Sequence, residues 1–525
     1  MPPPSSSIED QIQQLTRRLA GFEARLIAIE QGTLGGSPPP TAGDVPAAPV
    51  ASSGPASLTA AIDPLRVVTN LGRSLIILGG AFLLRAITDS SFIPPSVGVP
   101  LGLIYALTWI GSAIRTGGRG DLLRAAFDGA TALIIGYPLV VEATLRFRLF
   151  TPPVAAFALG ALTAIALVAA WRRTQQPLAG MAVIGGLATG LTLMVRTGVV
   201  ASFSLYFTAL GVGTLWLSYI RGWKILRWPT GVVAAFVVLG LTSRALGKEP
   251  LEPPAQALAA QALLLGAYLG SIAVRTLVRG RQVIVFEVVQ TVLVLIVGLG
   301  GLLYVIQTTG AGRVALGAFV FGLGVAAYAV AFQFLARQAT SALNFYFYSA
   351  LALIFVLVGT GTLLAGTARD MAFTAAGLLL AGAWLRSARV TLDVHTTLAL
   401  GIAAAGAGLL SLARAAWVGA LPAPDVPVWP AAVVLAAVVG VGACRIAEWA
   451  DPWPAPRAVP ALALGALAAF GSAGLATLLV VRVTEAAIAM PVTPEVLETA
   501  RTAVLSFVVL GATALTRPDR WSTVD

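Results

Sequence analysis

Long apolar segments separated by short polar loops fill most of this 525-residue sequence. Only 11% of the residues are charged and 57% are hydrophobic, whereas a soluble globular protein has about 25% charged residues. From about Leu65 onward, about 16 segments are long enough to cross the hydrocarbon core of a bilayer. The sequence therefore predicts an all-α, polytopic integral membrane protein. The segments centre near Ile77, Ala106, Ile135, Ala161, Leu187, Ala209, Phe236, Leu265, Leu295, Gly324, Ile354, Leu378, Ala403, Val438, Ala468 and Val508.

Basic residues are distributed unequally between alternate loops. If both termini are cytoplasmic, the cytoplasmic loops hold about 20 Arg and Lys residues and the opposite loops about 11, which is the bias expected of inner-membrane topology. The opening residues MPPPSSSIEDQ lack the apolar core of a cleavable signal peptide. The net charge of +11 comes from small groups between spans, with no basic domain, so we expect no nucleic-acid binding. We expect a bacterial inner-membrane protein with both termini in the cytoplasm.

A repeating pattern accompanies the basic loops. Seven times, a Gly/Ala/Leu-rich segment ends in a basic turn and a second apolar segment returns. Because each unit holds two spans, successive units keep the same orientation, which predicts tandem parallel helical hairpins. Any regular run of spans with short loops shows a similar period, so that alternative stays open. The turns begin, about every 55 residues, at Arg115, Arg172, Arg221, Arg275, Arg337, Arg386 and Arg445.

The segment before the first span has a heptad pattern. Apolar residues recur at alternating spacings of four and three, which predicts a coiled coil that associates with another copy, another protein or a surface of the same protein. The heptad residues are Ile8, Ile12, Leu15, Leu19, Phe22, Leu26 and Ile29. A Pro/Gly/Ala-rich, nearly uncharged stretch follows, which is typical of a flexible linker. The predicted organisation is disorder at 1–7, a cytoplasmic coiled coil at 8–30, a linker at 31–64, a transmembrane bundle at 65–516 and a cytoplasmic tail at 517–525.

Two stretches carry a family resemblance. They are NLGRSLIILGGAFLLRAITD and FDGATALIIGYPLVVEATLRFRLFTPPVAAFALGALTAIALVAAWRRTQQPLAGMAVIGGLATGLTL. Together with the coiled coil and the proline-rich linker, they resemble an uncharacterised bacterial family of predicted many-span membrane proteins, a domain of unknown function. The likeness is clearest over residues 8–195. The family's usual Trp after Gly-Asn before the first span is absent from TNLGRS. The resemblance implies a bacterial inner-membrane location and supplies no catalytic residue.

Recognisable catalytic chemistry is missing from the sequence. No HExxH, GxSxG or Walker A pattern occurs, and no cluster of metal-ligating residue types stands out. We therefore predict no catalytic residue, no metal and no cofactor. We expect the single histidine, His395, to make a hydrogen bond at the membrane interface, although pH sensing is an alternative role.

Glu287 is the most informative ionisable residue. It lies six residues after Arg281, or about 9 Å along a helix, and Gln290 lies one turn deeper on a similar face. An ionisable group within the hydrocarbon is costly and indicates function by default. Glu287 is therefore a candidate proton- or cation-binding carboxylate with Gln290 beside it. The alternative is a structural partner for an arginine or a hydroxyl group on a neighbouring helix.

The third apolar segment carries two acids and an internal proline. Asp128 follows Arg124 by four residues and Glu142 precedes Arg146 by four, spacings that predict local ion pairs. Pro138, with Gly136 two residues before it, predicts a break that opens the helix. These residues are candidate ion or substrate ligands and a candidate helix break. The alternative is a pair of interfacial ion pairs with a packing kink.

The sequence favours a transporter or a lipid- or envelope-handling protein that uses an intramembrane carboxylate. In that hypothesis Glu287 binds the coupling ion, and Arg124 or Arg146 meets an anionic lipid head group. The alternative is an oligomerising envelope scaffold that assembles through residues 8–29. Membrane lipids are the expected partners in both cases.

Overall fold

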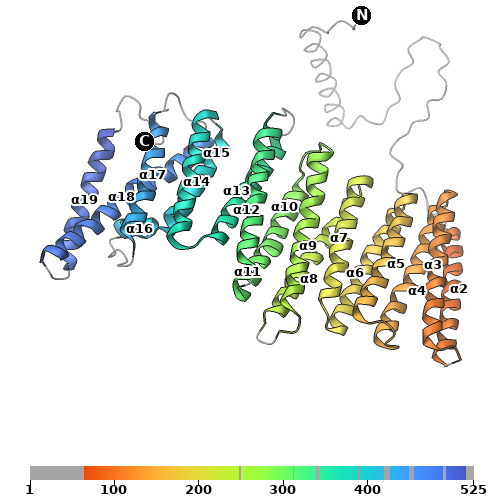
Figure 1. The fold of residues 1–525 in the computed structure, drawn as a ribbon. Coiled ribbons are helices and arrows are strands. Elements are labelled where there is room, and N and C mark those ends of the chain that lie inside the picture. The colour runs from red at the N-terminus through yellow and green to blue at the C-terminus, as the bar shows by residue number, and fades with distance from the viewer. Residues whose placement is uncertain are drawn as a thin grey trace, which may run out of the picture. The chain divides into compact units, whose positions relative to one another are not determined.

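The computed structural model describes residues 64–90, 92–247, 250–310, 312–337, 342–387, 389–418, 426–447, 455–488 and 492–515. Within these ranges the chain forms helices joined by short loops and contains no strand (Figure 1). The prediction of an all-α fold is confirmed. The predicted coiled coil at 8–30, residues 31–63 of the linker and the tail at 517–525 lie outside the described residues.

The first helices are α2 (Pro64–Asp89), α3 (Pro95–Gly118), α4 (Leu122–Leu145), α5 (Pro152–Arg173), α6 (Gln176–Thr197), α7 (Ala201–Arg221), α8 (Arg227–Ala245) and α9 (Pro254–Ala273), which continues as the π-helix η1 (Val274–Val278). The next are α10 (Val285–Val294), η2 (Leu295–Leu299), α11 (Gly300–Thr309), α12 (Arg313–Ala329), η3 (Val330–Phe334), η4 (Leu335–Arg337) and α13 (Ala342–Leu363). The last are α14 (Gly366–Ser387), α15 (Val390–Gly406), α16 (Leu409–Val418), α17 (Val428–Ala447), α18 (Ala455–Ile488) and α19 (Pro494–Leu515).

The described residues contain 13 helices that are long and apolar enough to cross a membrane, or 14 if the bent pair α15–α16 counts as one span. Every predicted segment centre lies in a helix. The predicted number of about 16 is not confirmed, because α14 and α19 are not among the helices that qualify within the described residues. Charged residues lower the hydropathy of both, with Arg369, Asp370 and Arg386 in α14 and Glu495, Glu498 and Arg501 in α19.

Helices that flank the seven basic turns contact each other. The pairs are α3–α4, α5–α6, α7–α8, α9–α10, α12–α13, α14–α15 and α17–α18. Neighbouring hairpins also touch through their first helices, since α3 contacts α5, α5 contacts α7, and α7 contacts α9. Adjacent helices joined by short turns contact each other in any helical bundle, so the predicted internal repeat stays a prediction.

Helix ends follow local backbone chemistry. Proline occupies the first turn of α3, α5, α6 and α9, where its missing N–H costs no helical hydrogen bond. Gly198 and Gly222 end α6 and α7 with positive φ angles of 71° and 76°, the conformation that closes a helix C-terminus. The sharpest interruption separates α15 from α16, which are bent by 78° at Gly408, whose φ is also positive.

Candidate functional site

Glu287 lies fully buried where α7, η1 and α10 meet. Its two carboxylate oxygens each accept a hydrogen bond from Nη1 of Arg275 at 2.8 Å. Oε1 also accepts one from the Tyr219 hydroxyl at 2.7 Å, and Oε2 accepts one from the backbone N–H of Ile284 at 2.9 Å. Each oxygen therefore has two donors. A charged carboxylate arranged in this way is neutralised and held in place by the protein itself.

This geometry corresponds to the alternative predicted from the sequence, in which the Glu287 carboxylate is a structural partner for an arginine and a hydroxyl group. A cation at Glu287 has to displace Arg275 or Tyr219, because the described residues leave neither oxygen without a donor. Gln290 is also buried, and its Oε1 lies against Gly231 of α8. The Nε2 group of Gln290 has no hydrogen-bond partner among the described residues.

The acids of α4 pair with α2 and not with their own helix. Asp128 is buried, lies 3.5 Å from Nη1 of Arg73 and accepts a 2.7 Å hydrogen bond from Ser112. Glu142 lies 2.6 Å from Nη2 of Arg85. The earlier arginine of α2, Arg73, contacts the earlier acid of α4, and the later arginine, Arg85, contacts the later acid. Helices α2 and α4 therefore run parallel at this interface.

The local ion pairs predicted from sequence spacing are wrong. Arg146 lies 2.9 Å from Asp89 of α2, not against Glu142, and the partners of Asp128 are Arg73 and Ser112, not Arg124. The physical reason is that α2 presents two arginines twelve residues apart beside acids fourteen residues apart. Packing against a parallel helix thus supplies partners that single-helix spacing does not reveal.

The helix break predicted at Gly136 and Pro138 is absent. Helix α4 continues through Pro138 from Leu122 to Leu145, which neighbouring helices make tolerable in a membrane bundle. Gly136 serves close packing, because a Cβ atom at that position would lie 2.6 Å from a methyl group of Leu162. The broken helix is instead α15–α16, which was predicted as one segment centred near Ala403.

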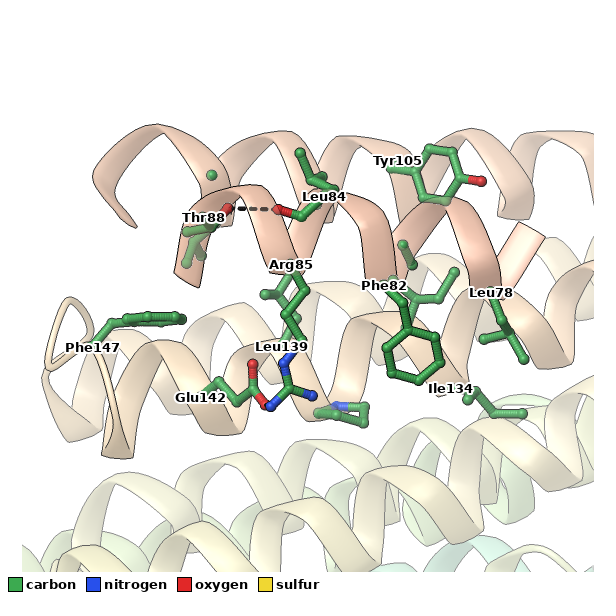
Figure 2. A pocket seen from close by; sticks show the side chains of 16 residues that line it. Leu78, Phe82, Leu84, Arg85, Thr88, Tyr105, Ile134, Leu139, Glu142 and Phe147 are labelled. Carbon is green, nitrogen blue, oxygen red and sulfur yellow. Dashed lines mark hydrogen bonds and ion pairs between the residues drawn. The ribbon is translucent and has the colours of Figure 1, made fainter. Parts of the chain in front are cut away.

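Pro138 lines a cavity of about 310 Å³ between α2, α3 and α4, which is partly open to the outside. Most of its lining is apolar, and Arg85 and Glu142 extend toward each other from α2 and α4 (Figure 2). The Thr88 hydroxyl donates to the Leu84 carbonyl on its own helix at 2.8 Å. The lining residues are Leu78, Ala81, Phe82, Leu84, Arg85, Thr88, Gly98, Val99, Gly102, Tyr105, Ile134, Ile135, Pro138, Leu139, Glu142 and Phe147.

Helix α2 forms one wall of this cavity and is weakly embedded in the protein. Of its 26 residues only Ser74, Ile77 and Thr88 are buried. Apart from the ion pairs with α4, a hydrogen bond of 3.0 Å from the Tyr105 hydroxyl to the Ile77 carbonyl joins it to α3. The attachment therefore depends on a few polar contacts and little apolar packing.

A four-charge cluster lies at the polar end of the cavity, and two of its members, Arg85 and Glu142, line the cavity. Arg85, Asp89, Glu142 and Arg146 are connected by ion pairs of 2.6 to 3.8 Å. The side chains of Arg85 and Arg146 are 46% and 51% exposed, so both guanidinium groups are accessible from outside. The cluster holds two positive and two negative groups, which suits a ligand that carries both signs of charge.

A second buried ion pair was not predicted. Arg445 and Asp393 are almost fully buried and paired, and Arg445 also donates to the Pro460 carbonyl at 3.1 Å and to the Thr397 hydroxyl at 3.0 Å. Arg445 lies in one of the basic turns, and no sequence signal distinguishes it from the exposed arginines that begin most of the other turns.

His395 is buried next to Tyr328, with 2.9 Å between its Nδ1 atom and the tyrosine hydroxyl. Within the described part of the chain, no group of three or more His, Cys, Asp or Glu side chains is placed to hold a metal ion.

Comparison with known proteins adds a family assignment. No curated protein and no solved structure matches the chain. Residues 65–523 match the profile of a family described as "Predicted membrane protein (DUF2339)". That match includes all of the described helices except for Pro64, the first residue of α2. It agrees with the family resemblance found in the sequence. The chain therefore belongs to the DUF2339 family of predicted membrane proteins, whose function is unknown.

Proposed function

We propose that this protein binds membrane lipids within the bilayer and that the cavity between α2, α3 and α4 accepts a lipid acyl chain. The observation that carries the proposal is an apolar cavity with one polar end and one weakly embedded wall. A volume of about 310 Å³ lies at the lower end of the range of about 300–1,000 Å³ typical of ligand pockets. A single acyl chain is a suitable occupant for a space of this size and polarity.

The charges at the polar end select the head group. Arg85 and Arg146 are suited to a phosphate, because guanidinium groups bind phosphate oxygens through paired hydrogen bonds. Asp89 and Glu142 are suited to the ammonium group of the same lipid. A zwitterionic phospholipid such as phosphatidylethanolamine therefore fits the four-charge cluster better than a purely anionic lipid.

Helix α2 offers the entry route. The face of α2 that is exposed includes Leu75, Ile76 and Phe82, which are expected to contact lipid. A lipid that reaches the cavity has to pass between α2 and its neighbours, and the few polar contacts that hold α2 limit the cost of that opening. We place the protein in the bacterial inner membrane with both termini cytoplasmic, supported by the distribution of basic residues between alternate loops.

The test is lipid binding to the full-length protein, measured by native mass spectrometry with added phosphatidylethanolamine. Ala81 lines the cavity and is only half-buried, so Ala81→Trp should fill the space and reduce binding by about tenfold. Ala188→Trp is the matched control, because Ala188 is exposed on α6 and lines neither cavity. Equal binding by the Ala81→Trp variant and the wild type would overturn the proposal.

The oligomerising scaffold remains the second candidate function, and the heptad pattern of residues 8–29 is the observation that favours it. That segment lies outside the described residues. Ion-coupled transport through Glu287 has less support, because a pathway needs a polar cavity and Glu287 is instead held by Arg275 and Tyr219.

A further inference from the structure

We infer that a second lipid site lies between α5 and α7, with its charged mouth at the C-terminal ends of these two helices, and that it selects an anionic phospholipid. The inference shares the proposed lipid-binding function, but it depends on different helices and on a different charge pattern.

The site is an apolar groove of about 250 Å³. On α5 it extends from Gly160 to Trp171 and on α7 from Tyr206 to Leu217, which is about 16 Å along each helix. The two helices contact each other and both end at basic turns. The groove lining consists of Gly160, Thr163, Ala164, Leu167, Val168, Trp171, Tyr206, Ala209, Leu210, Gly213 and Leu217.

The mouth of the groove is positively charged. Trp171 is followed directly by Arg172, and Nη2 of Arg221 donates to the Trp171 carbonyl at 2.8 Å, which places that guanidinium group at the mouth. Lys224 follows in the same turn as Arg221, and all three basic side chains are exposed. Neither 171–175 nor 221–227 contains an acidic residue. This end therefore complements a net negative head group, unlike the mixed cluster beside α2.

The deep end of the groove is closed by hydroxyl groups. The Thr163 hydroxyl lies 3.2 Å from that of Tyr137 and 3.4 Å from that of Tyr206. Thr163 also donates to the Leu159 carbonyl and Tyr137 to the Ala182 carbonyl, both at 2.8 Å. These hydroxyl groups are satisfied within the protein, so this end of the groove offers no free polar group to a head group, and we expect the head group to bind at the basic end.

Gly213 provides open space within the groove. A Cβ atom at Gly213 would meet no atom within 4 Å, so a larger side chain can occupy the groove without a backbone clash. Gly213→Leu should therefore block the groove and leave the fold intact, because leucine is also a better helix former than glycine. Gly240→Leu is the matched control, since Gly240 on α8 also has open space and lines neither cavity.

The experiment is native mass spectrometry of the full-length protein with added phosphatidylglycerol or phosphatidylethanolamine. We expect Gly213→Leu and the double variant Arg172→Gln/Arg221→Gln to bind phosphatidylglycerol about tenfold more weakly than the wild type. Gly240→Leu should behave like the wild type, as should Arg196→Gln, which removes an exposed charge at the other end of α6.

Two outcomes separate this inference from the lipid-binding function as a whole. If Ala81→Trp lowers phosphatidylethanolamine binding while the α5–α7 variants bind phosphatidylglycerol normally, the second site is refuted and the first is kept. If Gly213→Leu lowers phosphatidylglycerol binding and Ala81→Trp changes nothing, the second site stands and the cavity beside α2 is refuted. A wild-type protein that binds neither lipid refutes both.

Discussion

Replacing Glu287 with leucine is expected to destabilise the protein, because it leaves the Arg275 guanidinium unpaired among packed helices. The Glu287 side chain has no exposed surface and that of Arg275 is only 16% exposed. The substitution also removes the acceptor for the Tyr219 hydroxyl and the Ile284 backbone N–H. The structure thus predicts a loss of folding stability and not merely of a ligand.

The size of the expected loss of folding stability follows from the burial of the Glu287–Arg275 ion pair. Removing one partner of a buried ion pair typically costs about 3–5 kcal/mol. Unfolding entropy is about 2.1 cal/mol/K per residue near 60 °C, so about 4 kcal/mol lowers the melting temperature by about 8 °C when about 250 residues unfold together. The double variant Glu287→Leu/Arg275→Met removes both charges and should regain at least about half of the loss.

The assay is thermal unfolding of the detergent-solubilised protein, followed by circular dichroism for the wild type, both single variants and the double variant. A Glu287→Leu protein that melts at the wild-type temperature would refute the structural role. In that case the functional interpretation of Glu287 as an ion-binding carboxylate would regain support. A double variant that is no more stable than either single variant would show that the unpaired Arg275 charge is not the cause of the loss.

Two further predictions concern other parts of the chain. Gly136→Leu should destabilise the protein by roughly 1–3 kcal/mol, because the new side chain collides with Leu162; Gly240→Leu, at an open position, is the control, and equal melting temperatures would contradict the packing role of Gly136. Deleting residues 1–60 should convert an oligomer into a monomer if residues 8–29 form a coiled coil, and light scattering coupled to size-exclusion chromatography that finds one and the same mass for both proteins would exclude that mode of assembly.

The sequence predicts the helices well and their contacts poorly. Hydropathy located a helix at every expected centre because the bilayer requires long apolar runs with internally satisfied backbones. The partners of Asp128 and Glu142 were wrong because they lie on α2, more than fifty residues away in the chain. Similarly, Arg275 precedes Glu287 by twelve residues across a turn, a separation that no single-helix rule connects.

The position of the helix interruption was also not predictable from the sequence. Proline usually disrupts a helix, yet α4 continues through Pro138. The bend between α15 and α16 occurs at Gly408, within an apolar run that contains no proline. Which interruption is realised depends on neighbouring helices, and a single sequence does not specify them.

The pairing of α2 with α4 also constrains how the protein is assembled during synthesis. Arg73 and Arg85 leave the ribosome before Asp128 and Glu142, and an arginine in the middle of an isolated membrane helix costs about 2.5–3.5 kcal/mol to insert. Helix α2 alone is therefore expected to insert poorly into the membrane. Once α4 has been synthesised, its two carboxylates neutralise the two arginines of α2. The first three spans are expected to leave the insertion machinery as one unit, so that the cavity between them forms before the rest of the bundle exists.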